Sequence, residues 1–361
     1  MTEAKRLDER KCSGCMKWTP TSPEKFHEAE KLMYQVLKND HETKFIEISN
    51  KNVIRTLKVG NHDDKTHPPL LMIHGFAAGS GFWMWNLDAL SKTRNVYAID
   101  LLGFARSSRP VFPEVPEEVD ELFIQSIEDW RRQMRLEKII ILGHSFGGYI
   151  SSIYSIKYPD RVLHLILDDP WGFPQIPEPG TGILENIPKW KIRLFKILTS
   201  FNPLSALRAA GPWGPSLVGR LRSDIVAKYD PLYSNEENSP IAHYIFHCNA
   251  QKPSGETAFQ TVSDKMVFAK NPLIHRFKDQ FPNNKPVTII TGGDSWVNGI
   301  SDFQSVQDIL SDKQLTVYFV EDAGHHVHAD QPNIFNKMVD SICTKTQTEY
   351  VKTFGRLETS I

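Results

Sequence analysis

The sequence predicts an α/β fold in which a mostly parallel sheet is covered by helices on both faces. Three observations carry this prediction. Short apolar runs alternate with longer segments of helical periodicity, the arrangement typical of parallel sheets. The first two runs are joined by a turn-forming segment, which predicts an initial antiparallel pair. The alternation also stops for about 100 residues in the middle of the chain. A length of 361 residues fits one large domain with an insertion, or two small domains.

Each predicted element follows from local pattern. Apolar or β-branched runs predict eight strands: Lys44–Ile48, Val53–Val59, Pro69–Ile73, Asn95–Leu101, Lys138–Leu142, Val162–Leu167, Val287–Thr291 and Leu315–Val320. Apolar residues at helical spacing predict helices between them: Trp85–Ser91, Glu118–Arg135, Phe146–Lys157 and Ile334–Thr344. The stretch from Ser22 predicts a further helix, with Ser as N-cap and Pro at the first helical position. This helix packs on the body of the protein or, with Trp18, anchors the chain at a lipid surface.

These elements divide the chain into four regions. Residues 1–43 form an N-terminal tail and helix, and residues 346–361 form a frayed C-terminal tail. Residues 44–171 and 272–345 build the α/β core. Residues 172–271, rich in Pro and Trp, form an inserted lid.

Composition excludes several classes of function. The formal charge of −1, from 42 basic and 43 acidic residues, argues against bulk binding to nucleic acid. The charged N-terminal stretch shows no apolar signal region, and no uncharged apolar run is long enough to span a bilayer. Four cysteines are too few for a disulfide framework, which favours a reducing cytoplasmic location. Cys12 and Cys15 form one C-x-x-C without a second ligand pair, so no metal is predicted.

The candidate nucleophile is Ser145, in the segment G-H-S-F-G-G at residues 143–148. The pattern G-x-S-x-G alone occurs by chance in roughly one chain in ten of this length. Here, however, a predicted strand leads into it and a predicted helix leaves immediately after it, as a nucleophile elbow requires. Side chains at Gly143 and Gly147 would collide with neighbouring backbone in such a turn.

A nucleophilic serine needs a general base and a carboxylate that orients the base. His325 follows the last predicted strand and is the candidate base, whereas His326 and His328 are expected to be solvated. Asp294 follows strand Val287–Thr291 and is the candidate acid. Three further aspartates remain as alternatives: Asp302 in the same loop, and Asp168 and Asp169 at the end of an earlier strand.

Two backbone N–H groups are expected to form an oxyanion hole. One belongs to Phe146, the residue after the nucleophile, and starts the following helix. The other belongs to Phe76, in the glycine-containing loop after strand Pro69–Ile73.

One lid segment, Lys189–Leu198, mixes four cations with six apolar side chains and has no acid. Such a segment fits a membrane interface, with cations at anionic headgroups. It equally fits a lid helix whose apolar side covers the site. Trp190 and Phe195 from this segment, and Trp171 before it, are the candidate substrate contacts.

Longer motifs carry a family resemblance. They are the Asp100–Pro110 loop, S-I-E-D-W at 126–130, P-W-G-F-P at 170–174, F-N-P-L at 201–204, residues 247–259 and H-H-V-H-A-D-Q-P at 325–332. With these, the chain resembles the α/β-hydrolase superfamily. Within it, the chain is similar to the branch of the lyso-N-acylphosphatidylethanolamine lipase and the lipid-droplet triglyceride-lipase coactivator. The resemblance implies an eight-stranded α/β-hydrolase core with a lid, and neither a metal nor an organic cofactor.

The resemblance also implies three functional hypotheses. The first is a serine lipase or phospholipase that cleaves acyl esters of (lyso)phospholipids, because Ser145 stands where the coactivator branch carries Asn. The second is a lipid-droplet-binding coactivator of a separate lipase, with a membrane or droplet surface and a lipase or coat protein as partners. The third is a lysophospholipid acyltransferase, through an H-x-x-x-x-D motif of His325 and Asp330. Asp330 has an alternative structural role as the N-cap of the following helix. Relatives often carry Asp where this chain has Asn298, which leaves Asp294 as the implied acid.

Overall fold

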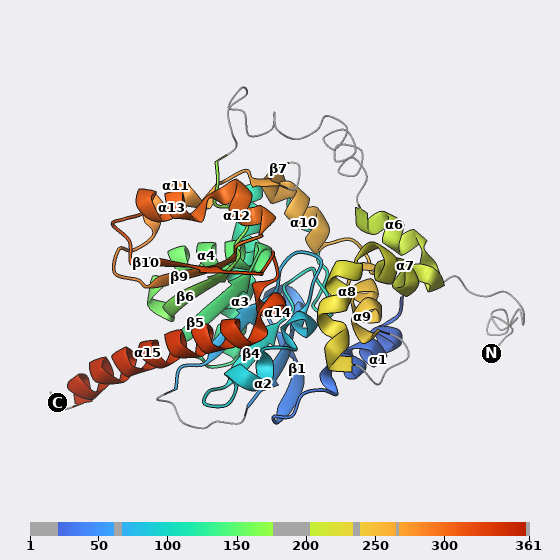
Figure 1. Cartoon of the computed structure of the whole chain (residues 1–361), viewed down its shortest axis with the longest axis horizontal. Helices are drawn as coiled ribbons and strands as arrows, with labels where there is room; N and C mark the ends of the chain where they lie inside the picture. Colours follow the sequence, from blue (N-terminus) through green and yellow to red (C-terminus); the bar gives the residue numbers. More distant parts are fainter. Residues whose placement is uncertain (1–20, 61–66, 176–202, 234–238, 265–266, 359–361) are drawn as a thin grey trace, which may run out of the picture.

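An eight-stranded, mostly parallel sheet forms the centre of the molecule, as the sequence predicts (Figure 1). The computed structural model describes residues 21–60, 67–175, 203–233, 239–264 and 267–358. The strand order is β1-β2-β4-β3-β5-β6-β9-β10. Strand β2 pairs antiparallel with both β1 and β4, and all other pairs in this sheet are parallel.

The predicted strands are found within three residues of their expected ends. They are β1 (His41–Glu47), β2 (Val53–Val59), β3 (Leu70–Ile73), β4 (Val96–Ile99), β5 (Ile139–His144), β6 (Val162–Asp168), β9 (Val287–Gly292) and β10 (Leu315–Val320). A short hairpin of β7 (Ser263–Asp264) and β8 (Phe268–Ala269) lies outside this sheet. The carboxyl ends of the parallel strands share one edge of the sheet, which is where side chains from distant parts of the sequence meet.

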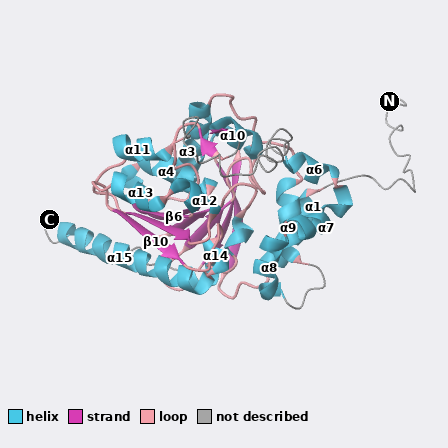
Figure 2. Cartoon of the chain, turned by 45° about the horizontal axis from the view of Figure 1, so that its top comes forward, coloured by secondary structure: helices cyan, strands magenta, loops and turns pink. Residues whose placement is uncertain are grey.

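Helices cover both faces of the sheet, as Figure 2 shows. On one face lie α3 (Pro116–Gln133), α4 (Phe146–Lys157), α11 (Leu273–Gln280) and α13 (Phe303–Ile309); on the other lie α2 (Leu87–Leu90) and α15 (Pro332–Glu358). Strand β5 illustrates the division. Ile139 and Ile141 belong to the first core, whereas Ile140 and Leu142 belong to the second, because successive side chains of a strand point to opposite faces. A strand buried on both faces explains the uninterrupted apolar run before Ser145.

A helical insertion lies between β6 and β9 (Figure 1). Its helices are α6 (Pro203–Ala209), α7 (Gly214–Leu221), α8 (Ser223–Tyr229), α9 (Pro240–Asn249) and α10 (Gly255–Val262), and we call these five helices the cap. The predicted segment at residues 189–198, with Trp190 and Phe195, lies outside the described residues.

The N-terminal helix α1 (Pro23–Tyr34) packs on the body of the protein, as one of the two predictions had it. Ser22 caps it by accepting a hydrogen bond from the N–H of Lys25. The Phe26 ring lies 5.6 Å from that of Tyr244 in cap helix α9. On the core side, the buried Glu30 pairs with Arg55 of β2 at 2.7 Å. Helix α1 therefore contacts the cap and the core at once; Trp18 lies outside the described residues.

The C-terminal helix corrects one prediction. Residues 346–358 are the last turns of α15, which ends at Glu358, and are not a frayed tail. The helix protrudes from the body of the molecule in Figure 1. Among the helices in the described part of the chain, none is both long and apolar enough to cross a membrane.

Candidate active site

Ser145 sits at a sharp turn between β5 and α4. Its φ of 52° and ψ of −118° lie in a region that L-residues rarely adopt, at a cost of about 1–3 kcal/mol. The predicted crowding at the flanking glycines is confirmed. A Cβ on Gly143 would come within 2.4 Å of Gly147 O, and one on Gly147 would come within 2.4 Å of His74 O. The turn therefore needs glycine at both positions and presents the serine at the carboxyl edge of the sheet.

His325 connects the serine to a buried carboxylate. Its Nε2 lies 2.9 Å from Ser145 Oγ, and its Nδ1 lies 2.5 Å from Asp169 Oδ2. Because a carboxylate accepts hydrogen bonds, Asp169 holds the proton on Nδ1 and leaves Nε2 free to accept the serine proton. This geometry is that of a nucleophile, its base and an orienting acid.

The structure corrects the predicted acid. Asp294 is exposed in the loop after β9, and the carboxylate on His325 Nδ1 is that of Asp169. The two positions are close because β6 and β9 are neighbours in the sheet, with Asp168 opposite Ile290. Asp302, the other alternative in the loop, caps α13 by binding Ser305.

Asp169 is fully buried, and hydrogen bonds from neighbouring protein groups replace those that water would make to its carboxylate. The hydroxyls of Thr291 and Ser295 donate to its two oxygens, each at 2.5 Å. Its own N–H donates to Ile290 O, and its φ of 44° turns the side chain toward His325. Residues around β9 thus support the acid, although they do not supply it.

The loop after β3 passes directly beside the serine. A Cβ built on Gly75 would lie 3.1 Å from Ser145 Cβ, so the backbone at Gly75 lies against the Ser145 side chain. Phe146 begins α4, and its backbone N–H points from the helix N-terminus. The geometry is compatible with the two predicted oxyanion donors, which remain a proposal.

A second Asp–His pair lies behind the first. His328 Nδ1 is 2.6 Å from Asp168 Oδ2, and both side chains are fully buried. This corrects the prediction that His328 is solvated; His326 is half-buried. Burial lowers the pKa of His328 to about 3, while burial and the nearby charge of Asp169 raise the pKa of Asp168 well above its usual value. His328 is therefore neutral at pH 7, and the shift at Asp168 favours the uncharged form of its carboxyl group.

His144 contacts the loop that carries His325, which we call the histidine loop. Its Nε2 lies 2.9 Å from the carbonyl oxygen of His325, and burial together with neighbouring histidines holds its pKa well below the usual value. Ligand atoms of His144, Asp168 and His328 lie within 4.8 Å of one another. The hydrogen bonds of this cluster already use His144 Nε2, His328 Nδ1 and Asp168 Oδ2, so we assign no metal to it.

Asp330 is the last residue of α14 (Val327–Asp330). Its Oδ2 accepts a hydrogen bond from the N–H of Gly324 at 2.9 Å, and its Oδ1 lies 2.7 Å from Lys228 Nζ in the cap. The N-cap predicted for this residue is therefore replaced by a different structural contact.

Aromatic side chains surround the serine. Trp171 is buried, its backbone N–H donates to the Ser145 carbonyl, and its ring packs on Phe146 and Phe259. Trp296, which is half exposed, lies 5.3 Å ring-to-ring from His325 and was not singled out from the sequence. The signal available in the sequence was its position, two residues after Asp294 in the loop that follows β9.

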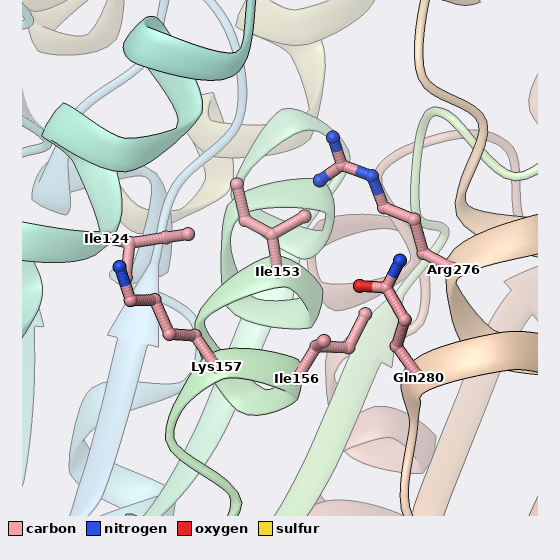
Figure 3. A pocket seen from close by; sticks show the side chains of 6 residues that line it. All are labelled: Ile124, Ile153, Ile156, Lys157, Arg276 and Gln280. Atoms are coloured by element: carbon pink, nitrogen blue, oxygen red, sulfur yellow. The ribbon is translucent and has the colours of Figure 1, made fainter.

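One cavity lies away from this site. Figure 3 shows it between α3, α4 and α11, with a volume of about 400 Å³. It is lined by Ile124, Ile153, Ile156, Lys157, Arg276 and Gln280. These residues border the last turns of α4, whereas Ser145 precedes its first turn, so this cavity does not open on the serine.

Comparison with known proteins agrees with the geometry. The family model described as the alpha/beta hydrolase fold matches residues 68–332, which include Ser145, Asp169 and His325. The chain belongs to the α/β hydrolase fold family. Among solved structures, a naproxen esterase from Bacillus subtilis superposes with a TM-score of 0.62 at 15% identity, covering 90% of this chain and 99% of the esterase. At that identity the likeness shows the shared α/β hydrolase fold alone.

Two curated members of the α/β hydrolase family match over nearly the whole chain. The human (lyso)-N-acylphosphatidylethanolamine lipase is 43% identical over 90% of this chain and 92% of its own length. The rat 1-acylglycerol-3-phosphate O-acyltransferase ABHD5 is 44% identical over 90% of both chains. This chain is thus similar to relatives that act on lipids and that carry two different reaction names.

Proposed function

We propose that this protein is a serine hydrolase that cleaves acyl ester bonds of phospholipids and lysophospholipids, including N-acylphosphatidylethanolamine species, through an acyl-enzyme. The carrying observation is the continuous hydrogen-bonded path from Ser145 Oγ through His325 to Asp169. Asp169 takes the role that the sequence assigned to Asp294.

In the first step, His325 Nε2 accepts the proton of Ser145 Oγ as that oxygen attacks the acyl carbonyl. The backbone N–H groups of Phe76 and Phe146 bind the developing oxyanion. These hydrogen bonds are stronger in a site from which water is excluded. The same proton then passes from His325 to the leaving alcohol. The acyl chain stays on Ser145 as an ester.

In the second step, water replaces the alcohol. His325 accepts a proton from the attacking water and then returns it to Ser145 Oγ as the acyl–serine bond breaks, which releases a fatty acid and restores the free serine. In both steps Asp169 stabilises the imidazolium of His325 and keeps a proton on His325 Nδ1. No metal or organic cofactor takes part in either step of this proposal.

A lipid substrate is supported by the relatives and by the cap. The relative of 43% identity is named for a lysophospholipid-type substrate. On the cap, Trp213 and Leu221 expose 68% and 69% of their surface, and the neighbouring Arg220 and Arg222 are exposed as well. Such a pairing of apolar and cationic groups suits contact with an anionic lipid surface, from a cytoplasmic, peripheral position.

A second candidate is acyl transfer to a lysolipid. The relative of 44% identity is named as an acyltransferase. An acyl-enzyme at Ser145 would pass its acyl group to a lysolipid hydroxyl instead of to water if the bound lysolipid kept water out of the site. Both reactions need Ser145, whereas coactivation of a separate lipase through lipid-droplet contact would not.

Covalent labelling tests the proposal. The purified protein is treated with a fluorophosphonate probe, and Ser145→Ala is compared with Ser216→Ala, which changes an exposed serine of the cap. We expect labelling of wild type and Ser216→Ala and none of Ser145→Ala. An unlabelled wild-type protein would refute the serine hydrolase.

Product analysis then separates the two reactions. The protein is incubated with vesicles containing a lysophospholipid that carries a labelled acyl chain. Labelled free fatty acid supports hydrolysis, and labelled diacyl lipid supports transfer. Stimulation of a lipase by Ser145→Ala, without either product from wild type, would favour coactivation instead.

A further inference from the structure

One ion pair links the cap to the loop that carries the candidate catalytic histidine. Lys228 belongs to cap helix α8, and its Nζ lies 2.7 Å from Asp330 Oδ1 in α14. The side chains of Lys228 and Asp330 expose only 23% and 13% of their surface to solvent. Pairs this shielded are less screened by salt than surface pairs, so the contact carries more weight than an ordinary surface ion pair.

The second oxygen of the same carboxylate reaches the histidine loop. Asp330 Oδ2 accepts the N–H of Gly324 at 2.9 Å, and Gly324 immediately precedes His325. A hydrogen bond to an ionised carboxylate is stronger than one between neutral groups. One side chain thus binds the backbone beside His325 and a cation of the cap.

Helix α8 is docked at this point by other contacts. The carbonyl of Lys228 accepts a hydrogen bond from Trp85 Nε1 at 2.9 Å. The hydroxyl of the next residue, Tyr229, donates to Phe82 O at 2.5 Å and lies 3.5 Å from His328 Nε2. The end of α8 therefore sits against the segment that runs from Gly324 to Asp330.

We propose that Asp330 is a positioning residue that couples the docking of cap helix α8 to the placement of His325. Lys228 on α8 holds one oxygen of Asp330, and the other oxygen fixes the Gly324 N–H. This inference rests on the proposed function of His325 as the base. When α8 is docked, His325 is held at 2.9 Å from Ser145 Oγ; when it leaves, the carboxylate loses its cation and the loop loosens.

This role differs from that of an acid in acyl transfer. Both oxygens of Asp330 are already engaged, by Gly324 and Lys228, and neither contacts Ser145 or His325. Because Asp330 would act through His325, replacing Asp330 is expected to slow the chemical step without changing the binding of a small ester.

Three variants test the coupling. Asp330→Asn and Lys228→Met each remove one charge of the pair, and Asp224→Asn is the matched control, because Asp224 lies on the same helix α8 and pairs with Arg222, the residue before that helix, instead of with the histidine loop. With a soluble short-chain ester, we expect kcat to fall about tenfold in the first two variants with KM unchanged, and no change in the control. The double variant should be no worse than either single one, because the two residues act together.

The pH–rate profile gives a readout that lost stability would not produce. The titratable groups around His325 are Asp169, His144 and His326, with Asp168 and His328 behind them and the Lys228–Asp330 pair beyond. Lys228→Met leaves a negative charge near the base and should move the acidic limb of kcat/KM to higher pH. Asp330→Asn leaves a positive charge and should move it to lower pH. Equal shifts, or none, would overturn the proposal.

Hydrogen exchange separates this proposal from the proposed function. The peptide covering residues 321–326 should exchange faster in Asp330→Asn and in Lys228→Met than in Asp224→Asn, and this measurement needs no turnover. If wild type failed to react with the fluorophosphonate probe while the exchange differed, the coupling would stand and the hydrolase would fail. Unchanged exchange in Lys228→Met would refute the coupling whatever the activity.

Discussion

Asp168 and Asp169 are consecutive and fully buried, yet each binds a different histidine. Asp169 holds His325, which contacts Ser145, and Asp168 holds His328 at 2.6 Å in the layer behind. Two ionised carboxylates side by side in a buried site repel each other strongly. Burial and the charge of Asp169 raise the pKa of Asp168, which favours its uncharged form and so reduces this repulsion beside the site where the imidazolium forms.

The first prediction concerns the acid. Asp169→Asn should lower kcat by about 10⁴-fold, because an amide favours the wrong imidazole tautomer and does not stabilise its cation. Asp294→Asn is the matched comparison and should stay within about threefold of wild type, since this side chain is exposed. Steady-state kinetics on one ester decide the matter. The reverse ranking would return the role to Asp294.

The second prediction concerns the neighbouring carboxyl. Asp168→Asn should leave kcat nearly unchanged, because a neutral amide still donates to His328 Nδ1 and the raised pKa of Asp168 already favours its uncharged form. Asp168→Ala leaves the buried His328 without this partner and should cost about 1–3 kcal/mol of unfolding free energy. Kinetics and chemical denaturation are measured on both variants. A strong loss of activity in Asp168→Asn would show that Asp168 must be charged.

The third prediction concerns the attachment of α1. Glu30 is buried between Arg55 and Arg106, and Tyr34 also donates to it. Glu30→Ala should destabilise the protein by about 3–5 kcal/mol, since it leaves the buried Arg55 without its counter-charge. Glu28→Ala, which changes an exposed residue on the same helix, is the control and should change stability by less than about 0.5 kcal/mol. Similar melting temperatures for the two variants would contradict this account.

The fourth prediction concerns acid stability. Burial lowers the pKa of His164 to about 4, where its ring bridges Thr288 and Thr346. The unfolded chain binds this proton near pH 6.5 and the folded chain only near pH 4, so stability is lost as the pH falls between these values. This one group contributes up to about 3 kcal/mol of that loss.

Denaturation curves at pH 7 and pH 4.5 measure the effect. His164→Gln should be less sensitive to acid than wild type, whatever its stability at pH 7. His41→Gln, which changes an exposed histidine, should keep the wild-type sensitivity. An unaltered pH dependence in His164→Gln would rule out His164 as a source of the loss.

Local pattern predicted the sheet because its inner strands, such as β3, β4, β5 and β9, are buried on both faces. Strand β5 reads as an apolar run ended by the glycines of the elbow, and these features are written in consecutive residues. The placement of Ser145 and His325 followed from the same pattern, since Ser145 comes directly after β5 and His325 lies in the loop after β10, both at the carboxyl edge of the sheet.

The acid could not be fixed in this way. Aspartates lie at the carboxyl ends of two neighbouring strands, Asp168 and Asp169 at the end of β6 and Asp294 in the loop just after β9, so strand order alone favours neither. The difference lies in burial and in hydroxyls from Thr291 and Ser295, which come from a strand more than a hundred residues away. His328 was misjudged for the same reason: its burial depends on packing against Trp83 and Tyr229, distant in sequence.

The double attachment of α1 has a consequence for biosynthesis. The hydroxyl of Thr21 binds His247, which lies 226 residues later, and the carbonyl of Met33 accepts a hydrogen bond from Tyr233, 200 residues later. At about 5–20 residues per second, the ribosome needs roughly 10–40 s to make that intervening chain. During that time Phe26 and Met33 of α1 lack the cap that later buries them, so these side chains stay exposed to aggregation until the cap has been translated.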